Sequence, residues 1–277
     1  MTLDRRTLLF QLAGEGPQRH DALGRVVALP PAERAALIDA ELARALVGLL
    51  ADAKRSGQRA AADALAPIVG KCAVLAETLH AALHAPDQRL RWGAAYAIGH
   101  SDLRSPAIWP ALREAMALPD GDQRWAAAEL ACSLARESTE ALVELRGTLS
   151  VAEPTLRKMV LYCLRDLGHD DLGSTAIAAL ADPDAGVRLA ALSALVRAQP
   201  DRAGRRSEWA DRIARMSITD ADPGVRRAAV ASLGKLGVRS PSVLDALATA
   251  ERAHDPSLVR AAAGARRDLT ANEPSAD

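Results

Sequence analysis

Aromatic side chains are scarce in this sequence. Among 277 residues there are four Trp, two Tyr and one Phe, which amount to 3% of the chain. Apolar residues nevertheless make up 49%, so any core must be built from Ala, Leu and Val. Small side chains of this kind suit helices that pack closely on one another, and no stretch shows the period of two that indicates a strand. The sequence therefore predicts an all-α fold.

Cysteines and long apolar runs are also few. The three cysteines, Cys72, Cys132 and Cys163, are an odd number without close spacing, which argues against a disulfide framework. No stretch approaches the ~20 apolar residues of a membrane span. We therefore expect buried free thiols, no membrane span and a cytoplasmic location.

The chain has no excess of either charge. Lys and Arg total 35, as do Asp and Glu, so the formal net charge is zero. Proteins that follow a nucleic-acid backbone usually carry a basic excess, so a nucleic-acid partner is not expected. The sequence also lacks a Gly-rich phosphate loop, a Ser-centred elbow and Cys-rich metal spacing. We therefore expect no conventional catalytic site and no cofactor.

One phrase recurs along the chain. It opens with an acidic residue, continues with an Arg four residues later and small residues, and ends near a Leu, as in residues 222–234 and 184–195. The phrase returns every 31–38 residues, and a period of this size indicates a solenoid of stacked helical pairs. The Arg of each phrase serves as a marker, and successive markers are 32, 33, 33, 31, 38 and 34 residues apart: Arg59, Arg91, Arg124, Arg157, Arg188, Arg226 and Arg260.

The phrase has a physical basis. Its acidic residue is a good helix N-cap, and a neighbouring Pro favours the start of a helix. An acid four residues before an Arg can also pair with it on one helical face. In stacked units such pairs predict a ladder of charges, in which each Arg contacts the acid four residues before it or the neighbour of that acid in the next unit. The prediction applies to Arg124, Arg157, Arg188 and Arg226.

The pattern resembles the short HEAT-like repeat of the phycobilin-lyase type, most clearly in residues 123–130 and 223–234. The resemblance covers roughly residues 50–268, and its first unit departs from the pattern because Arg55, not an acid, precedes Arg59 by four. It implies a right-handed alpha-alpha superhelix of about seven helical hairpins. We predict an N-terminal helix and cap over residues 1–30, a repeat array over 31–270 and a disordered tail over 271–277.

Aromatic residues gather on the second helix of successive units, which lines the concave side in HEAT-like arrays. They can fill space between repeats or form an exposed patch. The equivalent position elsewhere holds Leu189 or Arg227, and a core position rarely accepts Arg, so we favour an exposed patch of the kind that anchors partners. The predicted binding residues are Trp92, Tyr96, Trp125, Glu129, Lys158, Tyr162 and Arg165.

These observations favour a non-catalytic adaptor or scaffold that docks a protein partner on its concave face. The resemblance to phycobilin lyases implies an alternative, a lyase or chaperone that acts on a tetrapyrrole-bearing partner, since aromatics beside Arg and Lys suit a planar ligand with carboxylates. A second alternative is similar to the HEAT-like alkylpurine DNA glycosylases, in which Trp125 would face the nucleotide and Glu129 would be the acid.

A metal site is the remaining possibility in the sequence. Glu77, His80 and His84 share one helical face, and His is a common metal ligand. The same spacing on an exposed helix is more often solvated polar surface. We therefore predict no metal site.

Overall fold

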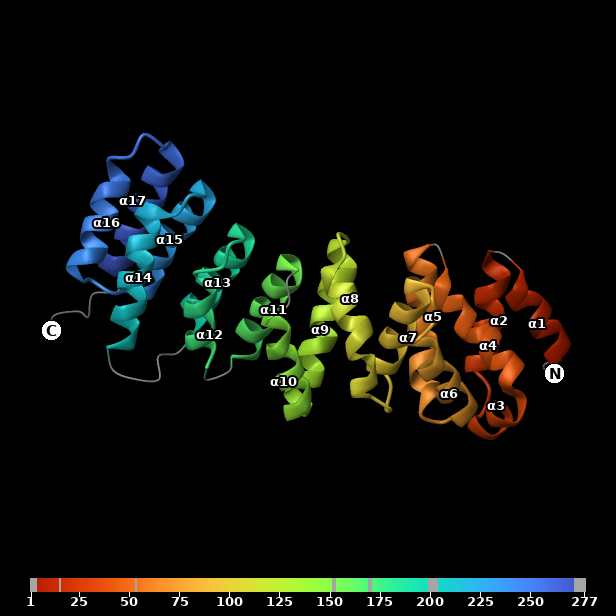
Figure 1. Cartoon of the computed structure of the whole chain (residues 1–277). Coiled ribbons are helices and arrows are strands. Elements are labelled where there is room, and N and C mark those ends of the chain that lie inside the picture. The colour runs from red at the N-terminus through yellow and green to blue at the C-terminus, as the bar shows by residue number, and fades with distance from the viewer. Residues whose placement is uncertain are drawn as a thin grey trace. The chain divides into compact units, whose positions relative to one another are not determined.

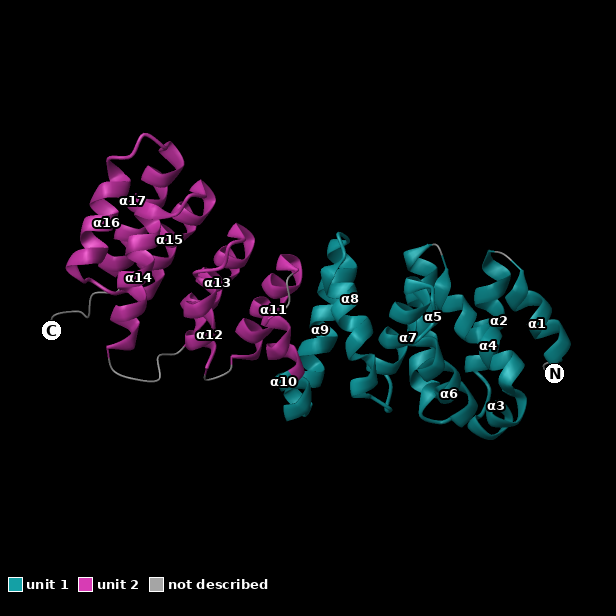
Figure 2. Cartoon of the chain, viewed as in Figure 1, with its two compact units in different colours: residues 1–143 teal, residues 144–277 magenta. Residues whose placement is uncertain are grey.

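Helices form every regular element that the structure describes. The structure, a computed structural model, describes residues 4–14, 16–52, 54–150, 153–168, 171–198 and 204–271. Over these ranges it contains no strand, which confirms the all-α prediction. None of the described helices is both long enough and apolar enough to cross a membrane. The chain divides into two units, residues 1–143 and 144–277 (Figure 2).

The first unit is an alternation of helices and short 3-10 turns (Figure 1). Its elements are α1 (Arg5–Ala13), α2 (Pro17–Val27), α3 (Pro31–Leu37), α4 (Ala40–Gly48), η1 (Leu49–Ala51), α5 (Arg55–Val69), α6 (Ala73–Ala82), α7 (Gln88–Gly99), η2 (Pro106–Ile108), α8 (Trp109–Ala117) and α9 (Gly121–Glu137).

Helix α10 (Thr139–Gly147) contains the boundary between the units. The second unit then continues the alternation of helices (Figure 1). Its elements are η3 (Thr148–Ser150), α11 (Pro154–Leu167), α12 (Leu172–Ala179), α13 (Ala185–Arg197), α14 (Arg205–Thr219), α15 (Pro223–Leu236), α16 (Pro241–Glu251) and α17 (Pro256–Ala271).

The seven marker arginines lie near the start of every second helix, in α5, α7, α9, α11, α13, α15 and α17. We call these the marker helices. In the first unit α5 packs on α7; in the second, α11 packs on α13, α13 on α15 and α15 on α17. The helical-hairpin repeat predicted from the marker spacing is therefore confirmed.

Small residues allow this packing. In α7 the side chains of Ala94, Ala95 and Ala97 are fully buried. At Gly234 in α15 a Cβ atom would lie 2.6 Å from the Cα of Ala265 in α17, so only glycine permits the two helices to approach so closely. The scarcity of aromatic residues in the sequence thus has its counterpart in closely spaced helices.

Two helices, and not the single short helix expected, follow one another near the N-terminus. The second of them, α2, packs against α5 and buries Ala22, Leu23 and Val26. The hydrophobic pattern of α2 spans only three turns, which is too short to have been assigned from the sequence alone. At the other end α17 runs to Ala271, and the remainder of the predicted tail lies outside the described residues.

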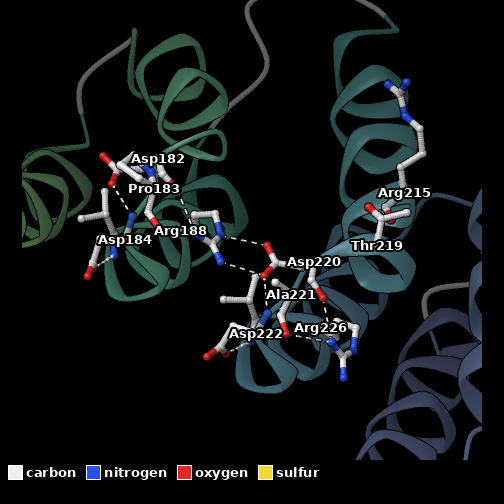
Figure 3. Close-up of polar contacts among 12 residues, drawn as sticks. Asp182, Pro183, Asp184, Arg188, Arg215, Thr219, Asp220, Ala221, Asp222 and Arg226 are labelled. Atoms are coloured by element: carbon white, nitrogen blue, oxygen red, sulfur yellow. Dashed lines mark hydrogen bonds and ion pairs between the residues drawn. The ribbon is translucent and has the colours of Figure 1, made fainter.

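The marker arginines bind across to the next repeat. In Figure 3 Arg188 donates Nε and Nη2 hydrogen bonds to the carboxylate of Asp220, both at 2.8 Å. Its Nη1 donates to the carbonyls of Asp182 and Pro183 in its own preceding loop, at 2.9 and 3.0 Å. Asp184, four residues before Arg188, instead accepts the N–H of Val187. The predicted pairing within one helix is thus wrong here, because the cap carboxylate satisfies the orphan N–H groups of the first turn.

The cross-repeat form of the predicted ladder recurs. Arg157 donates two hydrogen bonds of 2.8 Å to the carboxylate of Asp182, and in the first unit Arg91 donates two of 2.9 and 2.5 Å to Glu114. Asp220 also accepts the N–H of Asp222 at 2.9 Å. One carboxylate therefore joins the arginine of one repeat to the helix start of the next.

For the other two arginines of the predicted ladder, the contacts described are those to carbonyls of the preceding loop, without a carboxylate of the next repeat. Arg124 donates to the carbonyls of Leu118 and Pro119, and Arg226 donates to those of Asp220 and Ala221. Arg91, Arg124, Arg188 and Arg226 thus each fix the turn that precedes their own helix.

Replacement of Arg188 by Ala should destabilise the fold. It would leave the carboxylate of Asp220, whose side chain is 7% exposed beside an arginine that is 13% exposed, without its counter-ion. We expect the free energy of unfolding to fall by about 2–3 kcal/mol, as when a largely buried pair loses one partner. Urea denaturation measures this fall, and Arg212→Ala, at an exposed position of α14, should change stability by less than about 0.5 kcal/mol. Equal small losses in both variants would contradict a structural role for the ladder.

The same carboxylates make stability depend on acid pH. Hydrogen bonds from Arg157 lower the pKa of Asp182. Burial alone raises the pKa of Asp220, but hydrogen bonds from Arg188 and the N–H of Asp222 lower it below its ordinary value. A carboxyl with a depressed folded pKa stabilises the fold above its unfolded pKa of about 3.9, and the stabilisation is lost as pH falls through the folded pKa.

We therefore expect this contribution to be constant from neutral pH to about pH 5 and to be lost progressively below about pH 4. Thermal melts across this range should show a steeper acid loss for the wild-type chain than for an Arg157→Ala, Arg188→Ala double variant. Identical slopes in the two proteins would show that these pairs do not control acid stability.

Candidate binding site

A cavity of about 180 Å³ lies between three successive marker helices of the first unit. Helix α7 packs broadly on α5 but only narrowly on α9, and small residues face the space left between them. The lining residues are Arg55, Ser56, Gln58, Arg59 and Ala62 from α5, Trp92, Gly93 and Tyr96 from α7, and Asp122, Gln123 and Ala126 from α9.

Two aromatic rings one helical turn apart form the α7 side of the cavity. The rings of Trp92 and Tyr96 meet edge to face, with centroids 5.7 Å apart. The guanidinium of Arg59 lies 5.4 Å from the centroid of the Tyr96 ring, in cation–π contact. On its other side the Tyr96 ring stacks against His100 at 4.2 Å. The aromatic surface is therefore held rigidly from several sides.

Burial and the nearby carboxylate of Asp63 raise the pKa of the Tyr96 hydroxyl, and Arg59 opposes this effect. The net shift is upward, so the hydroxyl stays protonated at neutral pH. The hydroxyl of Tyr96 therefore lies within reach of both the carboxylate of Asp63 and the guanidinium of Arg59.

Charged residues line the edge of the cavity. Arg55 forms ion pairs with Asp120 and Asp122, which tie the start of α5 to the start of α9. Helix α5 has Lys54 at its N-cap position, without a side-chain hydrogen bond, and no acid in its first turn. The absence of an acid four residues before Arg59 thus gives this repeat a basic helix start where most other marker helices have an acidic cap.

Two of the lining residues, Gln58 and Gly93, fix the backbone. The side-chain amide of Gln58 donates to the carbonyls of Leu50 and Arg89, both at 2.7 Å, and so joins η1, α5 and the start of α7. A Cβ atom at Gly93 would lie 2.6 Å from the Cβ of Leu50, so glycine is required for this approach. The cavity is therefore part of a well-determined junction between repeats.

The predicted site residues of the first unit occupy different environments. Trp92 is 8% and Tyr96 7% exposed, whereas Trp125 is 47% exposed. Glu129 is exposed on the same helix as Trp125 but does not line the cavity. The expectation of exposure is wrong for Trp92 and Tyr96, because α5 covers the face of α7 that carries them. The narrow packing between α7 and α9 leaves the ring of Trp125 in solvent.

The remaining predicted residues lie on α11 in the second unit. Lys158, Tyr162 and Arg165 are all half-buried. The guanidinium of Arg165 lies 5.0 Å from the centroid of the Tyr162 ring, and it pairs with Asp166 at 2.8 Å. These three residues therefore belong to a surface of the second unit and not to the cavity of the first.

Sequence reasoning did not identify most of the cavity. The cavity had one signal in the sequence: the repeat pattern departs at Arg55 and Arg59, where basic residues replace the acidic cap. The contributions of Gln58, Gln123 and Ala126 had no such signal, since they depend on how far apart three helices lie.

His80 lies in α6, and His84 follows the end of that helix. The Nδ1 atom of His80 lies 2.8 Å from the carbonyl oxygen of Ala76, and His84 is exposed. Among the residues that the structure describes, no group of three or more His, Cys, Asp or Glu side chains is placed to hold a metal ion.

Comparisons with known proteins agree with this repeat architecture. A family model of HEAT repeats matches residues 174–266, all within the second unit, and no curated protein matches the sequence. A chain in the structure of Kap95p bound to RanGDP is 13% identical with a TM-score of 0.59, and the similarity covers 96% of this chain and 40% of that one. A chain of an engineered protein is 19% identical with a TM-score of 0.44, over 95% of this chain and 77% of that one.

Residues 174–266 therefore match HEAT repeats, and the chain has a fold similar to that of the chain in the Kap95p structure. This chain spans less than half the length of that chain. The family match does not distinguish the phycobilin-lyase type of repeat from other HEAT repeats.

The burial of the two tryptophans predicts opposite consequences of their removal. Trp92→Ala should lower the free energy of unfolding by about 3 kcal/mol, because it empties a packed position. Trp125→Ala should lower it by less than about 1 kcal/mol, since nearly half of its side chain is in solvent. Urea denaturation of the two variants compares them directly, and a larger loss for Trp125→Ala would contradict the packing described for α7 and α9.

Proposed function

We propose that this chain is a protein-binding scaffold and that the cavity of its first unit receives a side chain of the partner. The observation that carries the proposal is the cavity itself, in which two fixed aromatic rings lie beside the exposed guanidinium of Arg59. Apolar pockets of this kind bind anchoring side chains at protein interfaces. The described residues that line the cavity do not include a nucleophile paired with a base, so they do not suggest a covalent reaction.

The rigidity of the cavity supports binding. Its rings are held by Arg59, His100 and the packing of α7 on α5, so a partner would lose little free energy in ordering them. Trp125 precedes the lining residue Ala126 on α9, and its side chain is exposed. We propose that Trp125 covers the flank of the bound segment and that Glu129 contacts its polar edge.

The chemistry of the cavity suggests the partner segment. An aromatic or aliphatic side chain would fill the space against Trp92 and Tyr96. An acidic residue beside it would pair with Arg59, whose guanidinium is exposed. The similar Kap95p structure is one in which a protein partner, RanGDP, is bound, which is compatible with this use of the fold.

The size of the cavity favours a side chain over a whole tetrapyrrole. Its volume of about 180 Å³ is below the roughly 300–1,000 Å³ of pockets that hold entire small molecules. A tetrapyrrole-bearing partner remains the second candidate, because aromatic rings beside arginine also suit a planar ligand with carboxylates. Mixing the protein with biliverdin distinguishes the two, since a bound tetrapyrrole would shift the visible absorption band.

Displayed random peptides test the proposal with the protein alone. We expect selection on the wild-type chain to enrich peptides in which an aromatic or large aliphatic residue adjoins an acid. Their affinity, measured by fluorescence anisotropy, should fall at least tenfold in Ala126→Trp, which places a ring in the cavity opening. Ala81→Trp, at an exposed position of α6, makes the same change away from the cavity and should leave affinity within twofold.

Two results would overturn the proposal. One is that the enriched peptides bind Ala126→Trp as tightly as the wild-type chain. The other is a biliverdin band that Ala126→Trp abolishes while no peptide is enriched, which would assign the cavity to a tetrapyrrole.

A further inference from the structure

The second unit has a groove of its own on the marker helices α11, α13 and α15. Its volume is about 440 Å³, and it is lined by both apolar and basic side chains. Leu189, Leu192 and Val196 of α13 form its apolar part. Leu192 is buried, whereas Leu189 and Val196 are half-exposed, so apolar surface is accessible in the groove.

Basic residues lie along the groove at the C-terminal ends of its three helices. Arg165, Arg197 and Lys235 line it, and each lies in the last turn of its helix. A cation at one helix C-terminus stabilises that helix through its dipole. Here the repeat brings three of them to one surface, where the only carboxylate among the lining residues described is that of Asp166.

The cap acids of α13 and α15 lie at the opposite ends of these two helices. Asp184 caps the start of α13 and Asp222 caps the start of α15. The separation of acidic starts from basic ends explains how a chain of zero formal net charge can present a locally positive groove.

Arg165 is held in a fixed orientation at one side of the groove. Its Nη1 donates to the hydroxyl of Ser193 at 3.1 Å, and its Nε donates to Asp166 at 2.8 Å. The face of its guanidinium lies against the Tyr162 ring. Arg197 and Lys235 are exposed, so these two cations are available for a partner's carboxylates.

We propose that this groove docks an acidic amphipathic helix of a partner protein. The apolar face of that helix would lie on Leu189 and Val196, and its Glu or Asp residues would pair with Arg197 and Lys235. An amphipathic helix presents apolar and charged residues at the spacing such a groove requires. This inference rests on the proposed function of the chain as a protein-binding scaffold, but it concerns a different unit and different residues.

A protein segment fits the groove better than a nucleic acid does. Among the described residues that line it there is no aromatic ring on which a base could stack. Its apolar half would also remain uncovered by a sugar-phosphate backbone.

A synthetic 18-residue peptide tests this inference. It carries Leu at helical positions i, i+3, i+4 and i+7 and Glu on the flanking positions, and a control peptide has the same composition in scrambled order. We expect fluorescence anisotropy to show binding of the amphipathic peptide and at least tenfold weaker binding of the scrambled one. Raising the salt concentration should weaken the amphipathic complex.

Charge reversal locates the binding. Arg197→Glu with Lys235→Glu should weaken binding of the amphipathic peptide at least tenfold. Arg206→Glu with Arg212→Glu makes the same change in charge at exposed positions of α14, outside the groove, and should change it less than twofold. Equal effects of the two double variants, or equal binding of the two peptides, would show that binding depends on overall charge and not on the groove. Either result would overturn the inference.

Further binding measurements complete the test. Absence of binding by the amphipathic peptide overturns the inference, and so does tighter binding of a dT20 oligonucleotide that the groove variant abolishes. Ala126→Trp should bind the amphipathic peptide like the wild-type chain. If the groove fails while the displayed peptides still require the cavity, the scaffold function stands and only this inference falls.

Discussion

The structure depends on one interaction, the contact of a marker arginine with a carboxylate of the following repeat. Arg188 shows it most fully, because the guanidinium holds its own turn through two carbonyls and the next repeat through Asp220. Asp220 in turn holds the N–H of Asp222, the cap of the next marker helix. Fork-shaped recognition of this kind fixes direction as well as distance. A core made of Ala and Leu carries little shape information, so we infer that these contacts set the register between repeats.

Different residues of a marker helix join the repeats and line the candidate binding surfaces. Arg91, Arg157 and Arg188 are occupied in joining repeats and are not available to a partner, whereas the guanidinium of Arg59 is exposed at the cavity. Residues one turn further along face the space between successive helices. In the first unit that space is a cavity with aromatic walls; in the second it is a groove with basic ends. The same repeated scaffold thus offers two chemically different surfaces, one in each unit.

Much of the fold could be predicted from the sequence. The marker spacing located seven helices, and the acid before each phrase predicted their caps at residues such as Asp184 and Asp222. The partner of Arg188 could not be predicted, since the chain offers acids both four residues before it and in the next repeat. The site was predicted less well: Trp92 and Trp125 share one register position, yet one is buried and the other exposed. Their difference comes from the separation of whole helices, which no local pattern encodes.

The proposed function requires that the cavity between α5, α7 and α9 receives a partner's side chain. Photo-crosslinking tests it most directly, with a selected peptide whose anchoring residue is replaced by a diazirine-bearing analogue. Mass spectrometry of the digested adduct should place the link on residues that line the cavity, such as Ala62, Trp92 or Ala126. Adducts confined to α6 or α8, or spread without preference over the chain, would contradict the account.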